Sequence, residues 1–172
     1  MSTVPADRRP PRVRPATPAD VPAITRVYNE GIADRQATLE TEPRDEAERA
    51  AWLADRDARH PVLVAERDGR VVGWGSLNRF NPRPAYRHVA DFSVYVGREA
   101  RGTGAGSALL AALVETATAL GYHKLVLAAL PFNAAGMRLY ARMGFREVGT
   151  YREQGLLDGR WVDVVLMERL LG

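Results

Sequence analysis

The chain has 172 residues, of which 46% are hydrophobic and 26% charged, and this balance predicts one soluble globular domain with a sizeable core. The absence of cysteine excludes disulfide bonds, a thiol nucleophile and thiolate metal ligands, and no apolar run is long enough to span a membrane, so we expect a cytoplasmic protein. The net charge of +3 comes almost entirely from scattered arginines, which favours a small anionic ligand over nucleic acid.

Proline positions and hydrophobic periodicity divide the chain into a tail and one domain. The segment Met1–Pro11 holds three prolines and no apolar repeat, so we expect a mobile tail before a single domain over residues 12–170. Alternating or short apolar runs predict strands at 13–16, 62–65, 71–74, 89–96, 125–130, 145–152 and 161–167. Apolar spacing and capping signals predict helices after Thr17-Pro18, at about Asp45–Ala58, from Ala108 to Gly121 and over Ala134–Met143. This order indicates an α/β domain with a largely antiparallel sheet and one central crossover helix.

The segment Asn78–His88 is rich in proline and arginine and is predicted to be a loop. It leads directly into the strand at 89–96, so its arginines are candidates for substrate contacts, although solvated surface explains the same composition. Within that strand, alternation places Asp91, Ser93 and Tyr95 on one face and apolar side chains on the other.

The segment Arg101–Ser107 is a glycine-rich turn between that strand and the central helix. Such a turn leaves amide groups without intrahelical partners at the positive end of the helix dipole, which predicts a phosphate site. A Walker loop is excluded because no lysine follows Gly106, and a dinucleotide fingerprint because Ser107 and Leu109 stand where its last glycine belongs. The remaining pattern is R-x-x-G-x-G, and a turn that uses glycine only for positive φ is the structural alternative.

This loop resembles the pyrophosphate loop of the GNAT N-acetyltransferases, and a second motif supports the resemblance. The stretch Asn133–Phe145 is similar to the family pattern N-x-x-A/S/G-x-x-x-Y-x-x-x-G-F at its asparagine, at Tyr140 and at Gly144-Phe145. The resemblance implies a GNAT-type α/β fold, with a mixed, largely antiparallel seven-stranded sheet and about four helices, and an enzyme that uses acetyl-CoA. It further implies cofactor contacts from Arg101, Gly102, Thr103, Gly104, Ala105, Gly106, Ser107 and Asn133.

Acetyl transfer from a thioester to an amine needs one group that accepts a proton and another that returns a proton to the leaving thiolate. Tyr140 is the candidate donor, and a packing aromatic is the alternative. The segment Tyr86–Val96 and the ending Asp158–Asp163 look like the phosphinothricin, methionine sulfoximine and arsinothricin N-acetyltransferase branch, which shows E-x-S/T-V-Y-V with the glutamate regarded as the base. Asp91 stands at that place and is one methylene shorter, so we expect it to act directly or through a bridging water. An ion pair with a nearby arginine is the alternative.

The same resemblance implies further contacts along the strand at 89–96. Val94, Tyr95 and Val96 should hold the pantetheine arm like an added strand, with an N–H near Val94 stabilising the tetrahedral oxyanion.

Substrate contacts are assigned to Arg83, Arg87 and Ser93. A guanidinium binds a carboxylate with paired hydrogen bonds, although both arginines can also be solvated loop cations. The three histidines share no ligand spacing with one another or with acids, so we expect no metal site.

We therefore expect a cytoplasmic N-acetyltransferase that acetylates the α-amine of a small glutamate-like amino acid by direct attack. The phosphinothricin, methionine sulfoximine and arsinothricin type of acceptor would make it a detoxifying enzyme. The alternatives are another amine, such as a polyamine, an aminoglycoside or a protein N-terminus, and a non-catalytic CoA-binding module. The expected partner is a small-molecule amine rather than nucleic acid or membrane, and related enzymes suggest a possible homodimer.

Overall fold

A computed structural model describes residues 9–172, so most of the predicted tail lies outside the described residues. In the described part, the strands are β1 (Arg12–Pro15), β2 (Val62–Arg67), β3 (Arg70–Arg79), β4 (Val89–Val96), β5 (Lys124–Ala129), β6 (Arg146–Leu157) and β7 (Arg160–Leu170). The helices are α1 (Val21–Asp34), α2 (Glu46–Ala54), α3 (Ala105–Ala119) and α4 (Ala134–Arg142), joined in places by short 3-10 turns. The predicted number and kinds of elements are confirmed.

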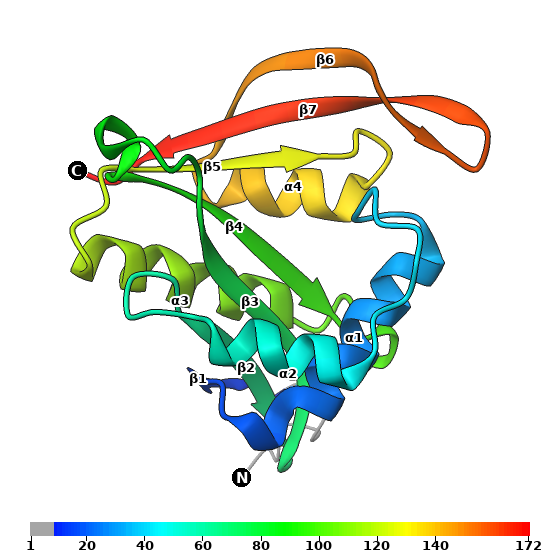
Figure 1. The fold of residues 1–172 in the computed structure, drawn as a ribbon, viewed down its shortest axis with the longest axis vertical. Helices are drawn as coiled ribbons and strands as arrows, with labels where there is room; N and C mark the ends of the chain where they lie inside the picture. Colours follow the sequence, from blue (N-terminus) through cyan, green and yellow to red (C-terminus); the bar gives the residue numbers. More distant parts are fainter. Residues whose placement is uncertain (1–8) are drawn as a thin grey trace, which may run out of the picture.

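The described strands form one seven-stranded sheet in the order β1-β2-β3-β4-β5-β7-β6 (Figure 1). Neighbouring strands run antiparallel except β4 and β5, which are parallel because α3 crosses between them. The β4–β5 pairing covers only Val89–Asp91 against Lys124–Val126. Beyond Asp91 the two strands diverge and the sheet opens.

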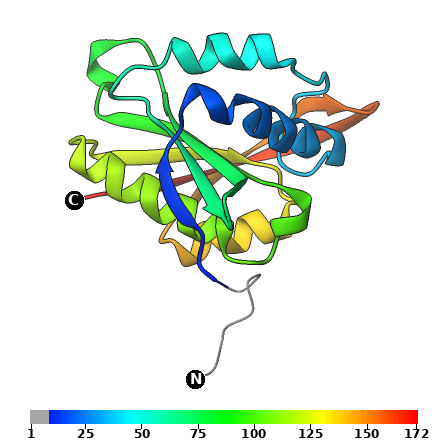
Figure 2. The same ribbon diagram turned by 90° about the horizontal axis from the view of Figure 1, so that it is seen from below.

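The helices cover both faces of the sheet, with α1 and α2 on one side and α3 and α4 on the other (Figure 2). The α3 side holds the larger core, in which Leu109, Leu110 and Leu113 are fully enclosed against Phe92 and Leu125. The α1 side holds a smaller core built on Ile24, Val27, Val64 and the ring of Trp74. Helix α3 is therefore apolar on the face that the sequence periodicity predicted.

Several element boundaries differ from the sequence prediction: β6 and β7 run further than predicted, α3 begins three residues earlier, and β3 and α2 differ for reasons that the structure shows. Strand β3 continues through Asn78 to Arg79, because its last residues pair with Asp91 and Ala90 of β4. Helix α2 ends at Ala54 rather than near residue 58. The Asp57 carboxylate accepts hydrogen bonds from the amides of Arg59 and His60 at 2.9 and 3.0 Å, which stabilises a turn in place of another helical turn.

Candidate active site

A pocket of about 710 Å³ opens where β4 leaves β5. It lies between the end of β4, the glycine-rich loop, helix α4 and the end of α1. Of the residues predicted from the sequence, it is lined by Val94, Tyr95, Val96, Arg101, Gly102, Gly104, Gly106, Ser107, Asn133 and Tyr140. Two motifs that lie about thirty residues apart in the sequence thus meet at one cavity.

The glycine-rich loop has a conformation that its glycines allow. Gly102 and Gly104 have φ of 74° and 91°, in the left-handed region that other residues adopt only with strain. Helix α3 begins at Ala105, and the amide of Ala108 donates to the Gly104 carbonyl at 3.0 Å as the first intrahelical bond. The earlier amides of this turn stand beside the pocket at the positive end of the helix dipole, so an anion can bind them.

A side chain at Gly106 would reduce the pocket. An added Cβ there would lie 3.4 Å from the side chain of Leu139 and 3.6 Å from that of Val96, both of which line the pocket. The helix thereby comes close to β4 and α4 while its backbone stays accessible.

Beyond Asp91, the backbone of β4 has no strand partner within residues 9–172 on the side that faces the opening. The carbonyl of Val96 accepts a hydrogen bond from Nε of Arg101 at 3.2 Å, whereas the amide of Gly97 donates to Val72 in β3 at 2.8 Å. The N–H and C=O groups of every second residue in a strand point to the same edge, so the amide and carbonyl of Val94 face the opening together with those of Val96. In the described residues β5 does not reach them. An extended ligand can therefore pair with this edge as another strand would.

Tyr140 reaches the pocket from α4. Its ring packs edge-on against Phe92 and Phe145, with centroids 6.0 and 6.5 Å away. Burial raises the pKa of its phenol, which therefore stays protonated and can donate a proton. Tyr95 lines the same pocket from the other face of the sheet, and its pKa is raised mainly by burial, with smaller contributions from Tyr28 and Tyr140. The opening thus connects the two faces.

Asp91 lies on the α1 face of the sheet and does not line the pocket with Tyr140. Its carboxylate accepts a hydrogen bond from Nδ2 of Asn78 at 3.2 Å, and the same nitrogen donates to Ser93 Oγ at 3.1 Å. Burial raises the pKa of Asp91, and the hydrogen bond from Asn78 only partly offsets this effect. No ion pair involves Asp91 in residues 9–172, so the arginine-partner alternative has no support.

Asn78 orients both polar side chains of β4. Its Oδ1 accepts hydrogen bonds from Ser76 at 2.9 Å and from Arg56 at 3.1 Å, while its Nδ2 serves Asp91 and Ser93. With acceptors and donors all engaged, the amide is held in one orientation. Sequence reasoning placed Asn78 in a loop and missed this role. The predicted strand ends at residue 74, whereas β3 continues to Arg79 and thereby pairs Asn78 with Asp91.

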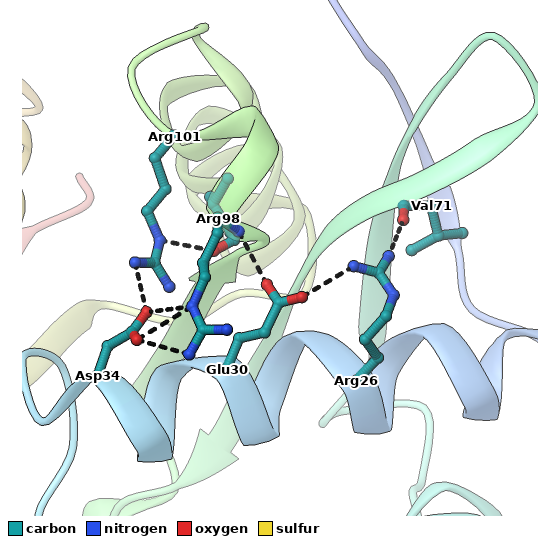
Figure 3. A network of polar contacts seen from close by, with 7 residues as sticks. Arg26, Glu30, Asp34, Val71, Arg98 and Arg101 are labelled. Atoms are coloured by element: carbon teal, nitrogen blue, oxygen red, sulfur yellow. Dashed lines mark hydrogen bonds and ion pairs between the residues drawn. The ribbon is translucent and has the colours of Figure 1, made fainter.

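The loop is tied to the end of α1 by a charged network (Figure 3). Asp34 accepts hydrogen bonds from Arg98 at 2.7 and 3.0 Å and forms an ion pair with Arg101 at 2.6 Å. These two arginines, led by Arg98, lower the pKa of Asp34 to about 2. Glu30 accepts the Arg98 amide at 2.8 Å, one turn earlier in α1. The network holds the Arg101 guanidinium at the wall of the pocket.

The remaining predicted residues lie outside the pocket. Thr103 binds Arg67, which donates to its hydroxyl at 2.9 Å and to its carbonyl at 3.1 Å, and Ala105 is part of the core. Arg83 and Arg87 are exposed on the loop after β3. No cluster of three or more His, Asp or Glu side chains that could hold a metal occurs among residues 9–172. None of the helices in that range is long and apolar enough to cross a membrane.

Sequence reasoning missed the part of the pocket that comes from the end of α1 and the residues after it, and most of the part that comes from α4 and the residue before its cap. These residues are Gly31, Asp34, Gln36, Ala37, Phe132, Ala134, Ala135, Gly136, Arg138, Leu139 and Arg142. The non-periodic composition of residues 34–43 was the only signal for the α1 side. On the α4 side, the Asn133 side chain accepts the Gly136 amide at 3.1 Å and caps the helix, which explains the asparagine of the second motif structurally.

Comparisons with known proteins agree with this geometry. Residues 24–145 match the family model described as acetyltransferase (GNAT) family. L-methionine sulfoximine/L-methionine sulfone acetyltransferase from Pseudomonas aeruginosa is 37% identical over 158 residues, which cover 91% of this chain and 92% of the relative.

Two solved structures have the same fold over nearly the whole chain. The ribosomal-protein-alanine N-acetyltransferase from Brucella melitensis is 40% identical, with a TM-score of 0.90 and coverage of 93% of this chain and 99% of that one. A phosphinothricin acetyltransferase from Sinorhizobium meliloti in complex with AcCoA is 34% identical, with a TM-score of 0.90 and coverage of 95% and 90%. The predicted fold, family and enzyme class are confirmed, and the chain belongs to the GNAT acetyltransferase family, in its phosphinothricin acetyltransferase-like branch.

Proposed function

We propose that the protein transfers acetyl from acetyl-CoA to the α-amine of a small glutamate-like amino acid. The observation that carries the proposal is the convergence of the phosphate loop, the open edge of β4 and the Tyr140 phenol on one pocket. The similarity to relatives named for methionine sulfoximine and phosphinothricin supports this class of acceptor. An arsinothricin-like acceptor belongs to the same class.

The pocket fits the two ends of acetyl-CoA. The first amides of α3 and the Arg101 guanidinium suit a pyrophosphate. The backbone edge of Val94 and Val96, which has no strand partner in the described residues and of which Arg101 engages only the Val96 carbonyl, suits the amide groups of a pantetheine arm. Acetyl-CoA supplies a thioester-activated acetyl group. At about 710 Å³, the pocket is large enough for this arm beside a small amine.

Two residues carry the proposed proton transfers: Asp91, on the α1 face of the sheet, and Tyr140, in the pocket. The carboxylate of Asp91 takes a proton from the substrate ammonium, directly or through a water, so that the amine nitrogen can attack the acetyl carbonyl. The N–H of Val94 stabilises the oxyanion as the C–N bond forms. When the C–S bond breaks, the Tyr140 phenol gives its proton to the thiolate. The raised pKa of Asp91 makes it a stronger base than an ordinary aspartate.

The exposed loop after β3 is the proposed binding element for the α-carboxylate. Arg83 and Arg87 lie there without an ion-pair partner in the described residues, so their guanidinium groups are free to bind an anion. Ser93, held by Asn78, is the proposed contact nearer to the amine. Replacing Arg87 with Gln should raise KM for the amino acid and leave KM for acetyl-CoA unchanged. Equal KM values for the amino acid would remove Arg87 from the proposal.

A protein N-terminus is the second candidate acceptor, because the solved structure at 40% identity is named a ribosomal-protein-alanine N-acetyltransferase. Thiol release from acetyl-CoA should be measured with phosphinothricin, methionine sulfoximine, arsinothricin, ordinary amino acids, polyamines and an alanine-initiated peptide. We expect the highest kcat/KM with the glutamate-like acceptors. A preference for the peptide would favour the second candidate, and the absence of thiol release with every one of these acceptors would indicate a different acceptor or a non-catalytic CoA-binding role.

We also propose that the protein works as a homodimer in the cytoplasm. The β6–β7 hairpin, which Figure 1 shows extending along one edge of the sheet, exposes the paired side chains of Leu156 and Trp161 at 56% and 63%, together with Tyr151. Exposed apolar side chains grouped on one hairpin are typical of a protein interface. Light scattering should give twice the chain mass, and Trp161→Glu should give the monomer mass. Cell fractionation tests the location.

A further inference from the structure

Helix α2 has one buried residue, and it is Arg49, which is 8% exposed. A helix that covers a sheet normally buries aliphatic side chains on its inner face. Here α2 lies outermost on the α1 side of the sheet (Figure 2), and its buried side chain carries a guanidinium that packs against the rings of Tyr28 and Trp74 beneath it. Removing such a cation from water is costly unless an anion or several acceptors compensate. The position of Arg49 therefore requires a partner.

The described residues provide no such partner. Nε and Nη2 of Arg49 and Nε1 of Trp74 are the enclosed side-chain nitrogens or oxygens without a hydrogen-bond partner in residues 9–172. All three are donors, and they belong to one cluster. The Arg49 guanidinium lies 3.8 Å from the ring centroid of Trp52, 4.7 Å from that of Tyr28 and 5.2 Å from that of Trp74. These rings attract the cation but accept no conventional hydrogen bond, so the site lacks an acceptor.

The charge of this site is also unbalanced. Burial is the main cause that lowers the pKa of Arg49; Tyr28 and Tyr95 partly offset it, whereas the positive charges of Arg44 and Arg56 add to it. No carboxylate in residues 9–172 forms an ion pair with Arg49. Nε and Nη2 are the parallel donors with which a guanidinium binds a carboxylate or phosphinate through two hydrogen bonds. The missing partner thus has the chemistry of a planar or tetrahedral oxyanion.

The cluster adjoins the proposed reaction centre on the same face of the sheet. Three residue pairs follow one another along β3 and β4: Trp74 with Tyr95, Ser76 with Ser93, and Asn78 with Asp91. Successive pairs are about 7 Å apart, since a strand rises by roughly 3.4 Å per residue. The Trp74–Tyr95 pair stacks with centroids 5.0 Å apart, and Tyr95 lines the pocket. A small amino acid with its amine near Ser93 can therefore extend its side chain toward Arg49.

We propose that Arg49 and the indole N–H of Trp74 form an anion subsite for the acidic side-chain group of the acceptor, a carboxylate or phosphinate. This inference rests on the proposed function, which it narrows to acceptors with an acidic side chain. Nε and Nη2 are enclosed, so the anion reaches them when α2 moves outward from the sheet, and α2 closes over the bound side chain. Arg83 and Arg87 remain for the α-carboxylate.

Steady-state kinetics of Arg49→Met separate this role from a structural one. Methionine keeps the apolar contact with the rings and removes the donors. KM for phosphinothricin, whose side chain is acidic, should rise roughly 10–150-fold, as expected for the loss of a hydrogen bond to a charged group. KM for methionine sulfone, whose side chain is neutral, and KM for acetyl-CoA should stay within about threefold of the parent values. Arg44→Met is the matched control, because Arg44 is already paired with Glu40 and Glu48.

Direct binding gives a readout that does not depend on turnover. In a Trp161→Phe background, the remaining tryptophans are Trp52 and Trp74 beside Arg49, so glutarate and phosphinothricin should change the fluorescence of CoA-saturated protein. Arg49→Met should abolish this response. Arg49→Lys, which keeps the positive charge and the packing but loses the paired donors, should weaken it and serves if the methionine variant does not fold.

The two proposals can fail separately. Suppose that the parent acetylates phosphinothricin. If Arg49→Met does so with the same KM, or if the variant raises KM for phosphinothricin and for methionine sulfone by the same factor, the anion subsite is wrong and the proposed function stands. If the parent acetylates neither amino acid, the proposed function fails, and the glutarate titration alone decides the subsite. An unchanged fluorescence response in Arg49→Met overturns it.

Discussion

Replacing Gly104 with Val tests whether the loop conformation holds the phosphate site. Gly104 has φ of 91°, which a β-branched residue adopts only with strain of about 1–3 kcal/mol. No atom lies within 4 Å of the position of its added Cβ, so the cost is backbone strain rather than collision. If the loop relaxes to relieve this strain, the first amides of α3 lose their alignment. Acetyl-CoA affinity should fall by roughly 5–160-fold, the same free energy expressed as an equilibrium constant.

Gly69→Val is the matched control for this prediction. Gly69 lies in the β2–β3 turn with φ of 75° and also has no atom within 4 Å of an added Cβ. Both variants should lose similar thermal stability, but calorimetric titration with CoA should show weaker binding only for Gly104→Val. Equal CoA affinity in the parent and in Gly104→Val would refute the assignment of the loop. Weaker binding in both variants would attribute the effect to general destabilisation.

Three further predictions concern Asp91, Tyr140 and Asp34. Asp91→Asn should lower kcat by about 10²–10⁴-fold with little change in CoA affinity. Burial raises the pKa of Asp91, so the stability contributed by this group is present at low pH and lost as the pH rises through its folded-state pKa. The asparagine variant should therefore melt at a higher temperature than the parent at neutral pH. A lower melting temperature would contradict this account. Tyr140→Phe should lower kcat in the thiol-release assay without changing KM for acetyl-CoA, and a parental rate would mean that another group donates the proton. For Asp34, whose pKa is lowered from 3.8 to about 2, the stabilisation is present above pH 4 and lost as the pH falls toward 2. Asp34→Asn should remove up to about 1 kcal/mol of this pH dependence in acid denaturation, and an unchanged acid limb would contradict the role of the ion pairs.

Local sequence patterns were sufficient to predict most of the fold. Two-residue alternation in β4 and the three- and four-residue spacing of leucines in α3 depend only on which face each side chain occupies. The glycines of the loop and the Asn133 cap are likewise local signals, and both now lie at the pocket. Turn chemistry also marked the Asp68-Gly69 hairpin, where both residues have positive φ.

The rest of the site depends on contacts between distant segments. Asp34 is 67 positions before Arg101 in the sequence, and no pattern in either segment predicts their ion pair. The local sequence predicts a loop at Asn78, and only the β3–β4 register places this residue opposite Asp91. Arg49 is one of many arginines in the sequence, and only the packing of α2 shows that it is buried among aromatic rings.

The short β4–β5 pairing leaves the sheet joined at its centre by three residue pairs. Beyond this seam, β4 belongs to one half of the molecule, and α4 follows β5 in the other. A ligand that contacts both halves stabilises their association, because its binding free energy favours the state in which the two halves are together. We therefore expect hydrogen exchange at the Val94 and Val96 amides to slow when CoA is bound. The two halves should separate most easily in the ligand-free protein, after the products have dissociated.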